Sequence, residues 1–388
     1  MRIEIANNLA QFSAVADDWD KMWDSSQASL PTLKSMPLIS AVKHFYRPAD
    51  FRTILVYENN QLVAGLPLVK SKLKNIFNIF SLPNNQWGEW GDLMVDQRFE
   101  SPQIYQALFD GLNRISKLPL RLTQIETSSE AWTKFLGACK INRRVIVEWP
   151  AWFVGMIDHE VHWPDFESQL SKDFRKKLSK YHRRFAKNGD LTFEHHYQFN
   201  EQDLDRYTTM AFELENTGWK GKQKSSVIAS GQLDFFLENA QQLANQNSLR
   251  VSFLRLDGKP IAFNFGAIGK RTYYSWKIGY DPEFAKFAPG HVLQHFLIRT
   301  FHDMGCCDVQ DKMGAISDAT RQWSSRFKLK SNVLISSNSL KSKSLVRLYL
   351  LYRTLRNLRK SRTGPSQPAA GMKPRTTGSP GQPATIHR

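Results

Sequence analysis

Residues 272–290 read TYYSWKIGYDPEFAKFAPG, and this stretch decides the fold class. Its first nine residues are typical of a β-strand, and a loop bounded by two prolines follows. After Pro289 and Gly290, apolar residues recur at helical spacing as far as Phe301. A strand, a glycine-containing loop and a helix start indicate a mixed α+β fold, with free backbone N–H groups that suit an anion. An ordinary helix start without a ligand is the alternative.

The same strand predicts two faces of a sheet. Strict alternation places Tyr274, Trp276, Ile278 and Tyr280 on one face, and Tyr273, Ser275 and Lys277 on the other. Small and polar residues on one face of this strand and of its predecessor favour a wet cleft, with a plain solvent-facing surface as the alternative. The chain has no GxGxxG or GxxxxGK[ST] pattern, which argues against dinucleotide-binding and P-loop folds.

Two strand–turn–strand units occur in the same order along the chain. Residues 58–64 and 256–262 both place turn residues between apolar strands, and a further strand, a loop and an amphipathic helix follow each unit. This order predicts two related halves of ordinary domain size. The boundaries that we expect are 1–160 and 161–338 for the two halves, 339–360 for a basic amphipathic helix, and 361–388 for a disordered tail.

The charge of the chain is concentrated in two segments. The 388 residues include 53 basic and 36 acidic side chains, for a net charge of +17. Residues 341–388 carry +11 and residues 169–187 carry +7, so the rest carries −1. In the second segment the apolar residues from Phe166 to Phe185 follow the period of one long helix that Gly189 ends. Because its aromatic residues follow the core-facing stripe, this helix does not by itself predict a nucleic-acid partner.

Cysteine and histidine patterns predict neither a disulfide framework nor a metal site. The three cysteines form no CxxC pair. His291 and His295 lie one helical turn apart but have no acidic third ligand nearby. The first residues lack the apolar core of a signal peptide, and no stretch reaches the ~20 apolar residues of a membrane span. We expect a cytoplasmic protein.

From residue 163 to residue 327 the sequence resembles the GNAT acyltransferases, in particular the CelD/BcsL-like branch that is associated with cellulose and exopolysaccharide biosynthesis. The resemblance is carried by the basic helix Leu170–Arg184, by ENTGWKG at 215–221, by LDGKPIAFNFG at 256–266 and by KIGYDPEFAKFAPG at 277–290. It implies two tandem GNAT-like domains with mixed, mostly antiparallel sheets flanked by helices. The second domain is better preserved, as in the Fem-type aminoacyl transferases.

The resemblance also implies a donor site for acetyl-CoA or another acyl-CoA, and no metal. The pantetheine arm would run beside Lys277, Ile278 and Gly279. The pyrophosphate would meet the backbone at the following helix start, formed by Ala288, Pro289, Gly290, His291 and Val292. The chain has fewer glycines here than the usual GNAT phosphate loop. It also lacks the Tyr-Lys pair that the family tends to show after the fifth strand, where it reads DKMG at 311–314.

Five residues are candidates for the chemistry of an acyl transfer. Glu215, near a predicted helix end, is the first candidate for the base, with a solvated helix-terminal glutamate as the alternative. Asp311 is the second candidate. Tyr280 is the candidate acid, with a packed strand tyrosine as the alternative. Trp219 and Lys220 would line the acceptor side, where an aromatic platform suits a sugar or a peptide.

Three functions are compatible with these residues. The first is an acyl-CoA-dependent N- or O-acyltransferase that acts on an amine or hydroxyl of a sugar, peptide or small molecule in exopolysaccharide biosynthesis. The second is a Fem-like transferase that uses aminoacyl-tRNA, for which the basic helix would supply phosphate contacts. The third is a non-catalytic polysaccharide-assembly protein. The C-terminal basic helix suits an anionic membrane surface at the inner face, or it packs on the preceding domain.

Overall fold

The computed structural model describes residues 1–73, 75–115 and 117–362. Contacts divide the chain into a large unit, Met1–Val346, and a second unit, Arg347–Arg388. The helix α13 (Leu340–Arg362) begins in the first unit and covers the region of the predicted basic helix. Most of the predicted disordered tail, residues 363–388, lies outside the described residues.

The N-terminal half of the large unit contains a sheet with helices on both faces. Its strands are β1 (Arg2–Ala6), β2 (Phe51–Glu58), β3 (Gln61–Leu73), β4 (Phe77–Ser81), β5 (Met94–Val95) and β6 (Leu120–Ile125). Its helices are α1 (Leu9–Ser13), α2 (Ala16–Ser25), α3 (Ser35–Phe45), α4 (Pro102–Ile115) and α5 (Glu130–Ile141). Leu55 and Val56 are neighbours on β2 and point to opposite faces, so Leu55 packs with α2 and α3 while Val56 packs with α4 and α5.

The C-terminal half repeats this layering. Its strands are β8 (Leu191–His196), β9 (Leu249–Leu256), β10 (Lys259–Gly269), β11 (Thr272–Tyr280) and β12 (Val309–Asp311). Its helices are α6 (Trp163–Gln169), α7 (Lys172–Ala186), α8 (Glu201–Thr217), α9 (Trp219–Lys222), α10 (Leu233–Asn245), α11 (Pro289–Met304) and α12 (Asp318–Arg321). α8 and α10 pack on the face that carries Phe263, and α7 and α11 pack on the face that carries Ala262.

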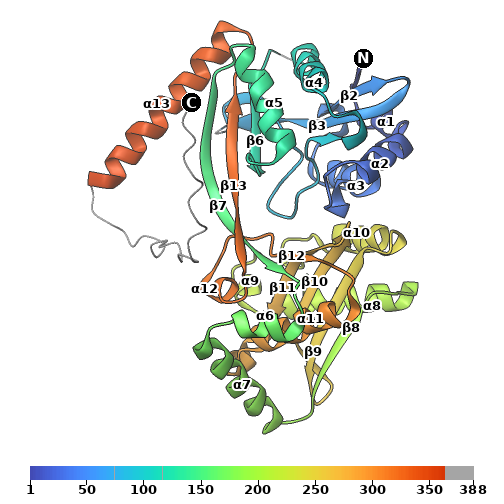
Figure 1. The fold of residues 1–388 in the computed structure, drawn as a ribbon, viewed down its shortest axis with the longest axis vertical. Coiled ribbons are helices and arrows are strands. Elements are labelled where there is room, and N and C mark those ends of the chain that lie inside the picture. The colour runs from blue at the N-terminus through green and yellow to red at the C-terminus, as the bar shows by residue number, and fades with distance from the viewer. Residues whose placement is uncertain (74, 116, 363–388) are drawn as a thin grey trace, which may run out of the picture. The chain divides into compact units, whose positions relative to one another are not determined.

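Two long strands join the halves, as Figure 1 shows: β7 (Ile146–Asp158) and β13 (Arg326–Ile335). β13 pairs with β7 along its length and with β6 near its end, where Val333 lies opposite Leu122. The continuous sheet has the order β1-β2-β3-β4-β6-β13-β7-β12-β11-β10-β9-β8, and β5 pairs with β3. The last strand of the predicted second domain thus extends the sheet of the first half. α3 and α10 also contribute to one hydrophobic core.

The two strand–turn–strand units have matching turns. Asn59 and Asn60 between β2 and β3 have φ of 49° and 62°, and Asp257 and Gly258 between β9 and β10 have φ of 49° and 77°. Two successive residues with positive φ are the mark of a type I′ hairpin turn. The structure therefore confirms the hairpins and the α+β fold that the sequence predicts.

The predicted long basic helix is wrong in one respect, because it is two helices. α6 ends before Leu170, and Ser171 caps α7 by accepting a hydrogen bond from the Phe174 N–H at 3.2 Å. Phe166, Leu170 and Phe174 nevertheless pack in the same hydrophobic cluster. The apolar period therefore continues across the break and could not reveal it.

Candidate functional site

The strand β11 contains a bulge at Trp276. The β10–β11 register shifts between Phe265 and Gly266, which leaves Trp276 as the extra residue. Trp276 and Lys277 therefore both contact Phe236 of α10: the two ring centroids are 5.1 Å apart, and the Lys277 Nζ lies 5.2 Å from the Phe236 centroid. The prediction that Lys277 and Trp276 face opposite sides is wrong, because a bulge moves the later side chains to the other face.

β11 and β12 separate after a short parallel pairing. The pairing ends at Tyr274 and Asp311, whereas β11 continues to Tyr280. After Asp311 the chain follows β7 instead, and the Lys312 N–H donates to the Gly155 carbonyl at 3.1 Å. Beyond Tyr274 the sheet order of the described residues places no strand against this edge of β11.

Polar side chains are enclosed between β11 and α11 at the point of separation. Lys312 Nζ donates to Gln294 Oε1 at 2.5 Å and to Ser275 Oγ at 3.3 Å, and Asn264 Nδ2 donates to the same Ser275 oxygen at 2.9 Å. Burial lowers the pKa of Lys312 to about 8, although the charge of Asp311 raises it. Since α11 covers this face, the expected wet cleft and the expected solvent face are both wrong here.

The start of α11 offers one backbone N–H from the predicted phosphate-binding stretch. Ala288 has a left-handed backbone, with φ 56° and ψ 53°, and its own amide bonds within the preceding turn. Pro289 has no N–H. The amides of His291 and Val292 donate to the Ala288 carbonyl at 3.0 and 3.3 Å. This leaves the Gly290 N–H to donate a hydrogen bond to an anion. The space that a Cβ would occupy at Gly290 is open.

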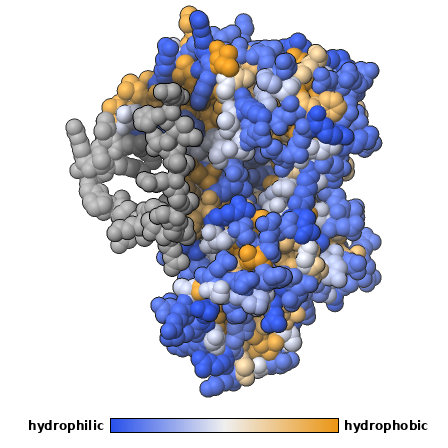
Figure 2. Space-filling model, in the orientation of Figure 1, coloured by the Kyte–Doolittle hydropathy of each residue, from blue (hydrophilic) through white to orange (hydrophobic). Residues whose placement is uncertain are grey.

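The basic helix α7 lies beside this helix start. Arg184 Nη1 donates to the Lys286 carbonyl at 3.1 Å, and the Tyr181 ring stacks on the His291 ring with centroids 6.1 Å apart. Burial lowers the pKa of His291, and the charge of Lys177 lowers it further. In Figure 2 the surface at the lower left, where α7 lies in Figure 1, is mainly hydrophilic. The basic residues of α7 are therefore far from residues 272–290 in the sequence but close to them in the structure.

Glu215 is buried at the end of α8, where its side chain is tied on both oxygens. Only 4% of the residue is exposed. Its Oε1 accepts from Lys220 Nζ at 2.6 Å and its Oε2 accepts from the Val227 N–H at 2.9 Å. A Cβ on Gly279 would lie 2.5 Å from the Phe263 ring and 3.4 Å from the Glu215 Cα. Gly279 thus permits α8 to approach β11 closely, and the alternative of a solvated glutamate is wrong.

The Glu215–Lys220 ion pair reaches the edge of β11. Lys220 Nζ lies 3.5 Å from the Ile278 carbonyl oxygen. Burial lowers the pKa of Lys277 to about 8, while Glu215 raises it and Lys220 lowers it. Four predicted site residues, Glu215, Lys220, Lys277 and Ile278, are therefore brought together.

Two further predicted residues are exposed near this end of β11. Trp219 is 61% exposed and Tyr280 is 43% exposed. The alternative reading of Tyr280 as a packed strand residue is therefore wrong. Gly218, which precedes Trp219, has the Tyr280 carbonyl oxygen 3.8 Å from the position of a Cβ. The two exposed aromatic residues thus flank the same part of the chain.

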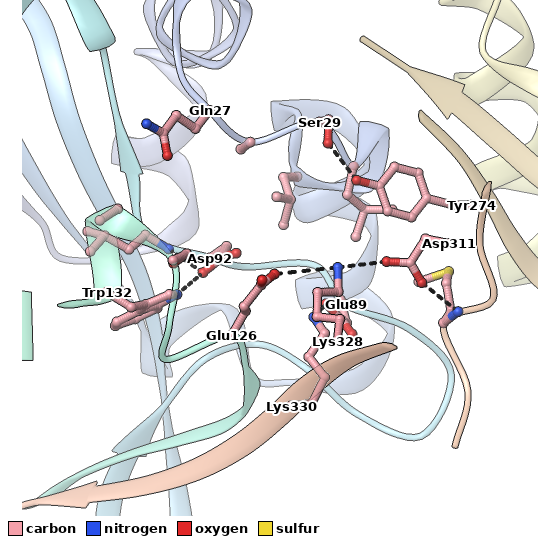
Figure 3. A pocket seen from close by; sticks show the side chains of 17 residues that line it. Gln27, Ser29, Glu89, Asp92, Glu126, Trp132, Tyr274, Asp311, Lys328 and Lys330 are labelled. Atoms are coloured by element: carbon pink, nitrogen blue, oxygen red, sulfur yellow. Dashed lines mark hydrogen bonds and ion pairs between the residues drawn. The ribbon is translucent and has the colours of Figure 1, made fainter. Parts of the chain in front are cut away.

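Asp311 lines a separate site, a cavity of about 280 Å³ between the two halves. Figure 3 shows its polar lining, which includes Gln27, Ser29, Glu89, Asp92, Glu126, Trp132, Tyr274, Asp311, Lys328 and Lys330. Asp311 Oδ2 accepts from Lys328 Nζ at 2.8 Å, and its Oδ1 accepts from the Met313 N–H at 2.7 Å. Glu215 is not part of this lining, so the two candidate bases belong to different sites.

Sequence reasoning missed most of the charged residues in and beside this cavity. They are Glu89, Asp92, Glu126, Lys312, Lys328 and Lys330. They come from separate segments of both halves, and only the tertiary fold brings them together. The one available signal was the pair of carboxylates that flanks Trp90 in a glycine-rich loop, since polar residues on such loops are often functional.

The histidines of α11 contact other side chains of the protein. Trp323 Nε1 donates to His291 Nδ1 at 3.1 Å, and the ring nitrogens of His182 and His295 are 2.9 Å apart. Among the described residues, no group of three or more His, Cys, Asp or Glu could hold a metal ion. Within the same ranges, the helices are too short or too polar for any of them to cross a membrane.

Similarities to known proteins are found both for one segment of the sequence and for the fold of the two halves. Residues 172–317 match the family described as the acetyltransferase (GNAT) domain. No curated protein matches the chain. The structure of FemX is similar, with a TM-score of 0.58 and 11% identity over 86% of this chain and 98% of FemX. A conserved protein of unknown function from Bacteroides thetaiotaomicron VPI-5482 has a TM-score of 0.54 and 13% identity over 87% of this chain and 100% of that one.

The family match includes β11, the loop after it and α11, and the structural match to FemX extends over both halves. At this level of identity, the structural matches concern the fold. Residues 172–317 thus match the acetyltransferase (GNAT) domain family, and the fold of the two halves together is similar to that of FemX.

Proposed function

We propose that this protein transfers an acyl group from acyl-CoA directly to an amine or hydroxyl of an acceptor. The observation that carries the proposal is the separation of β11 from β12 after Tyr274 and Asp311. An unpaired strand edge can form backbone hydrogen bonds with an extended ligand, and the amide groups of a pantetheine arm are such a ligand. The arm would run from Tyr280 towards Tyr274.

The donor's phosphates have a place at the far end of this arm. Gly290 contributes a backbone N–H at the start of α11, and Lys177 and Arg184 of α7 lie beside it. A helix N-terminus and nearby basic side chains both favour a pyrophosphate. Since Lys220 reaches the Ile278 carbonyl, we place Lys220 and Trp219 beside the donor arm rather than the acceptor.

The reacting end of the donor would lie beside the cavity between the halves. Tyr274 and Asp311 end the strand pairing and also line the cavity. We therefore place the acceptor in the cavity. The acceptor nitrogen or oxygen attacks the thioester carbonyl carbon, the C–S bond breaks, and the released thiolate takes up a proton.

Two residues near the end of the pairing have roles in these proton transfers. The Asp311 carboxylate would take the proton that the attacking nitrogen or oxygen releases. Lys312, whose pKa is lowered to about 8 by burial, would give a proton to the thiolate, because an acid with a pKa near the working pH is efficient. Glu215 would act as a positioning residue that holds Lys220 against the donor arm, and Tyr280 would flank that arm.

A Fem-like transfer from aminoacyl-tRNA is the second candidate, and the basic surface of α7 favours it, because it suits any polyphosphate. Calorimetric titration of the full chain with acetyl-CoA and with uncharged tRNA separates the two. Binding of acetyl-CoA supports the first proposal, and binding of tRNA alone supports the second. Binding of neither would reject both and favour a non-catalytic role. The resemblance to the CelD/BcsL-like branch supports an acceptor from exopolysaccharide biosynthesis.

We also propose that α13 holds the protein at an anionic membrane surface on the cytoplasmic side. Ser342 and Val346 at its start are buried, whereas Leu348, Leu351 and Leu355 are 60%, 54% and 51% exposed. These leucines follow the i, i+3, i+7 spacing of one helix face. The sequence of α13 contains basic residues and no acidic residue. Exposed leucines on a basic helix suit the interface of an anionic bilayer.

A further inference from the structure

The cavity between the halves has more negative than positive side chains. Its lining contains four carboxylates and two lysines: Glu89, Asp92, Glu126, Asp311, Lys328 and Lys330. Lys328 Nζ is shared, at 2.8 Å from Asp311 and 3.5 Å from Glu126. Lys330 Nζ lies 3.0 Å from Glu89. Among the ion pairs of the described residues, these leave Asp92 as the lining carboxylate that has no cationic partner.

The Asp92 carboxylate also has an oxygen that the protein does not use. Both of its hydrogen bonds reach Oδ1, from Trp132 Nε1 at 2.7 Å and from the Leu93 N–H at 2.8 Å. No hydrogen bond of the described residues reaches Oδ2. In Figure 3, Asp92 lies beside Trp132 on the wall of the cavity, across from Tyr274 and Asp311.

Such an arrangement is costly without a ligand. Burial raises the pKa of Asp92 to about 6, even though the charge of Lys330 and the hydrogen bonds from Leu93 and Trp132 lower it. A partly buried carboxylate that has no cation within ion-pair distance is unfavourable, and a bound cation would remove much of that cost. An ammonium group fits, because it carries one positive charge and three N–H donors. Apolar lining residues such as Ala28 and Leu33 can contact its alkyl chain.

We propose that Asp92 binds an ammonium group of the acceptor. The acceptor then has two polar ends, an ammonium held at Asp92 and a nucleophilic amine or hydroxyl that reaches Tyr274 and Asp311. The substrate class is an organic cation such as a diamine, an amino alcohol or a basic amino-acid side chain. This assignment rests on the proposed function, in which the cavity is the acceptor site.

The test uses three probes of matched length on the full chain: diaminobutane, butanediol and succinate. In calorimetric titration, we expect diaminobutane to bind and the neutral and anionic probes not to bind. Asp92→Asn keeps the acceptor oxygen for Trp132 and Leu93 but removes the charge. It should therefore weaken diaminobutane binding by about tenfold or more, as loss of a charged hydrogen bond does. The matched control is Asp110→Asn, which changes a carboxylate of α4 outside the cavity.

The outcomes separate this inference from the proposed function. Acetyl-CoA is titrated into the same wild-type and Asp92→Asn preparations, which should bind it equally. If diaminobutane binds through Asp92 but acetyl-CoA does not bind, the cation site stands and the donor proposal fails. If acetyl-CoA binds but diaminobutane does not bind at millimolar concentration, the ammonium assignment is overturned. Equal diaminobutane binding by wild type and Asp92→Asn, or preferred binding of succinate, also overturns it.

Discussion

Tyr274 and Asp311 are the last paired residues between β11 and β12, and both line the cavity between the two halves. Two features of the fold therefore meet at one point of the sheet. On one side of this point the edge of β11 is unpaired, and on the other side the cavity begins. Direct acyl transfer needs such adjacency, because the nucleophile and the thioester carbonyl must be held within reach of each other.

Gly290→Ala tests the donor site at the start of α11. Gly290 has ordinary backbone geometry, and a Cβ would meet open space. The substitution should leave the fold intact and raise its stability by about 0.5–1 kcal/mol, since alanine is the better helix residue. If phosphates approach this backbone, the added methyl group should lower acetyl-CoA affinity by about tenfold. Calorimetric titration and thermal unfolding measure the two effects.

Gly137→Ala is the matched control, because Gly137 also lies in a helix with open space at the Cβ position. It should raise stability in the same way without any effect on acetyl-CoA. Unchanged acetyl-CoA affinity in Gly290→Ala would place the phosphates elsewhere.

Lys177→Gln tests the role of α7 in binding phosphates. Loss of this exposed charge should weaken acetyl-CoA binding by a few-fold and make the affinity less sensitive to salt. Because the charge of Lys177 lowers the pKa of His291, the variant should raise that pKa, which an NMR titration can follow independently of the ligand. Lys140→Gln, on α5, is the control. A raised His291 pKa with unchanged acetyl-CoA affinity would show that α7 does not contact the donor.

Glu215→Gln tests the Glu215–Lys220 ion pair beside Ile278, near the C-terminal end of β11. The variant retains an oxygen acceptor but loses the charge that holds Lys220 at 2.6 Å. We expect a higher KM for acetyl-CoA, a folded protein and lower turnover at subsaturating donor. The pKa of Lys277 should fall further below about 8, since Glu215 raises it. Glu213→Gln, an exposed residue of the same helix, is the control. A large loss of kcat at saturating donor would instead indicate that Glu215 is the base.

The leucine face of α13 is tested by changing Leu348, Leu351 and Leu355 together to Gln, which preserves helix propensity. Sedimentation with phosphatidylglycerol vesicles measures binding. Wild type should pellet with the vesicles, less so at high salt, and the triple variant should pellet about tenfold less. Ile141→Gln removes an exposed apolar residue, 82% exposed, from a different helix and should have no effect. Equal pelleting of wild type and the triple variant would exclude this face as the membrane contact.

The sequence predicted the parts of the site that are local in the chain. The strand, loop and helix over 272–304 could be read from alternation, proline position and helical spacing, because each depends on neighbouring residues. The bulge at Trp276 could not be read, since it depends on which residue of β10 pairs with Ser275 and which with Lys277. The break at Ser171 was hidden by an apolar period that continues through it.

The residues that line the cavity could not be predicted from the sequence, for a different reason. Asp92 and Asp311 are more than two hundred positions apart in the chain. They line one cavity because β13 inserts between β6 and β7 and so fixes one half against the other. Neither carboxylate belongs to a motif with a characteristic spacing. Long-range strand order, rather than local pattern, creates this cavity.

Asp92→Asn should stabilise the protein at neutral pH, because the Asp92 carboxylate lowers the stability of the fold in the absence of a bound cation. The pKa of Asp92 is raised from 3.8 to about 6 in the folded protein. The folded protein therefore binds a proton at Asp92 more tightly than the unfolded chain does. The wild-type protein therefore loses stability as pH rises from about 4 to about 6. The variant does not titrate, so it should be more stable than wild type above pH of about 6 and similar to it near pH of about 4.

Urea unfolding of both proteins across this pH range measures the difference. Asp96→Asn is the contrasting variant, because the carboxylate of Asp96 is paired with Arg98, which helps to lower its pKa although burial raises it. That substitution should destabilise the protein at neutral pH, where the Asp96–Arg98 pair contributes. If Asp92→Asn is instead destabilising at neutral pH, the Asp92 carboxylate is satisfied within the protein. The proposal that the cavity binds a cation would then fail.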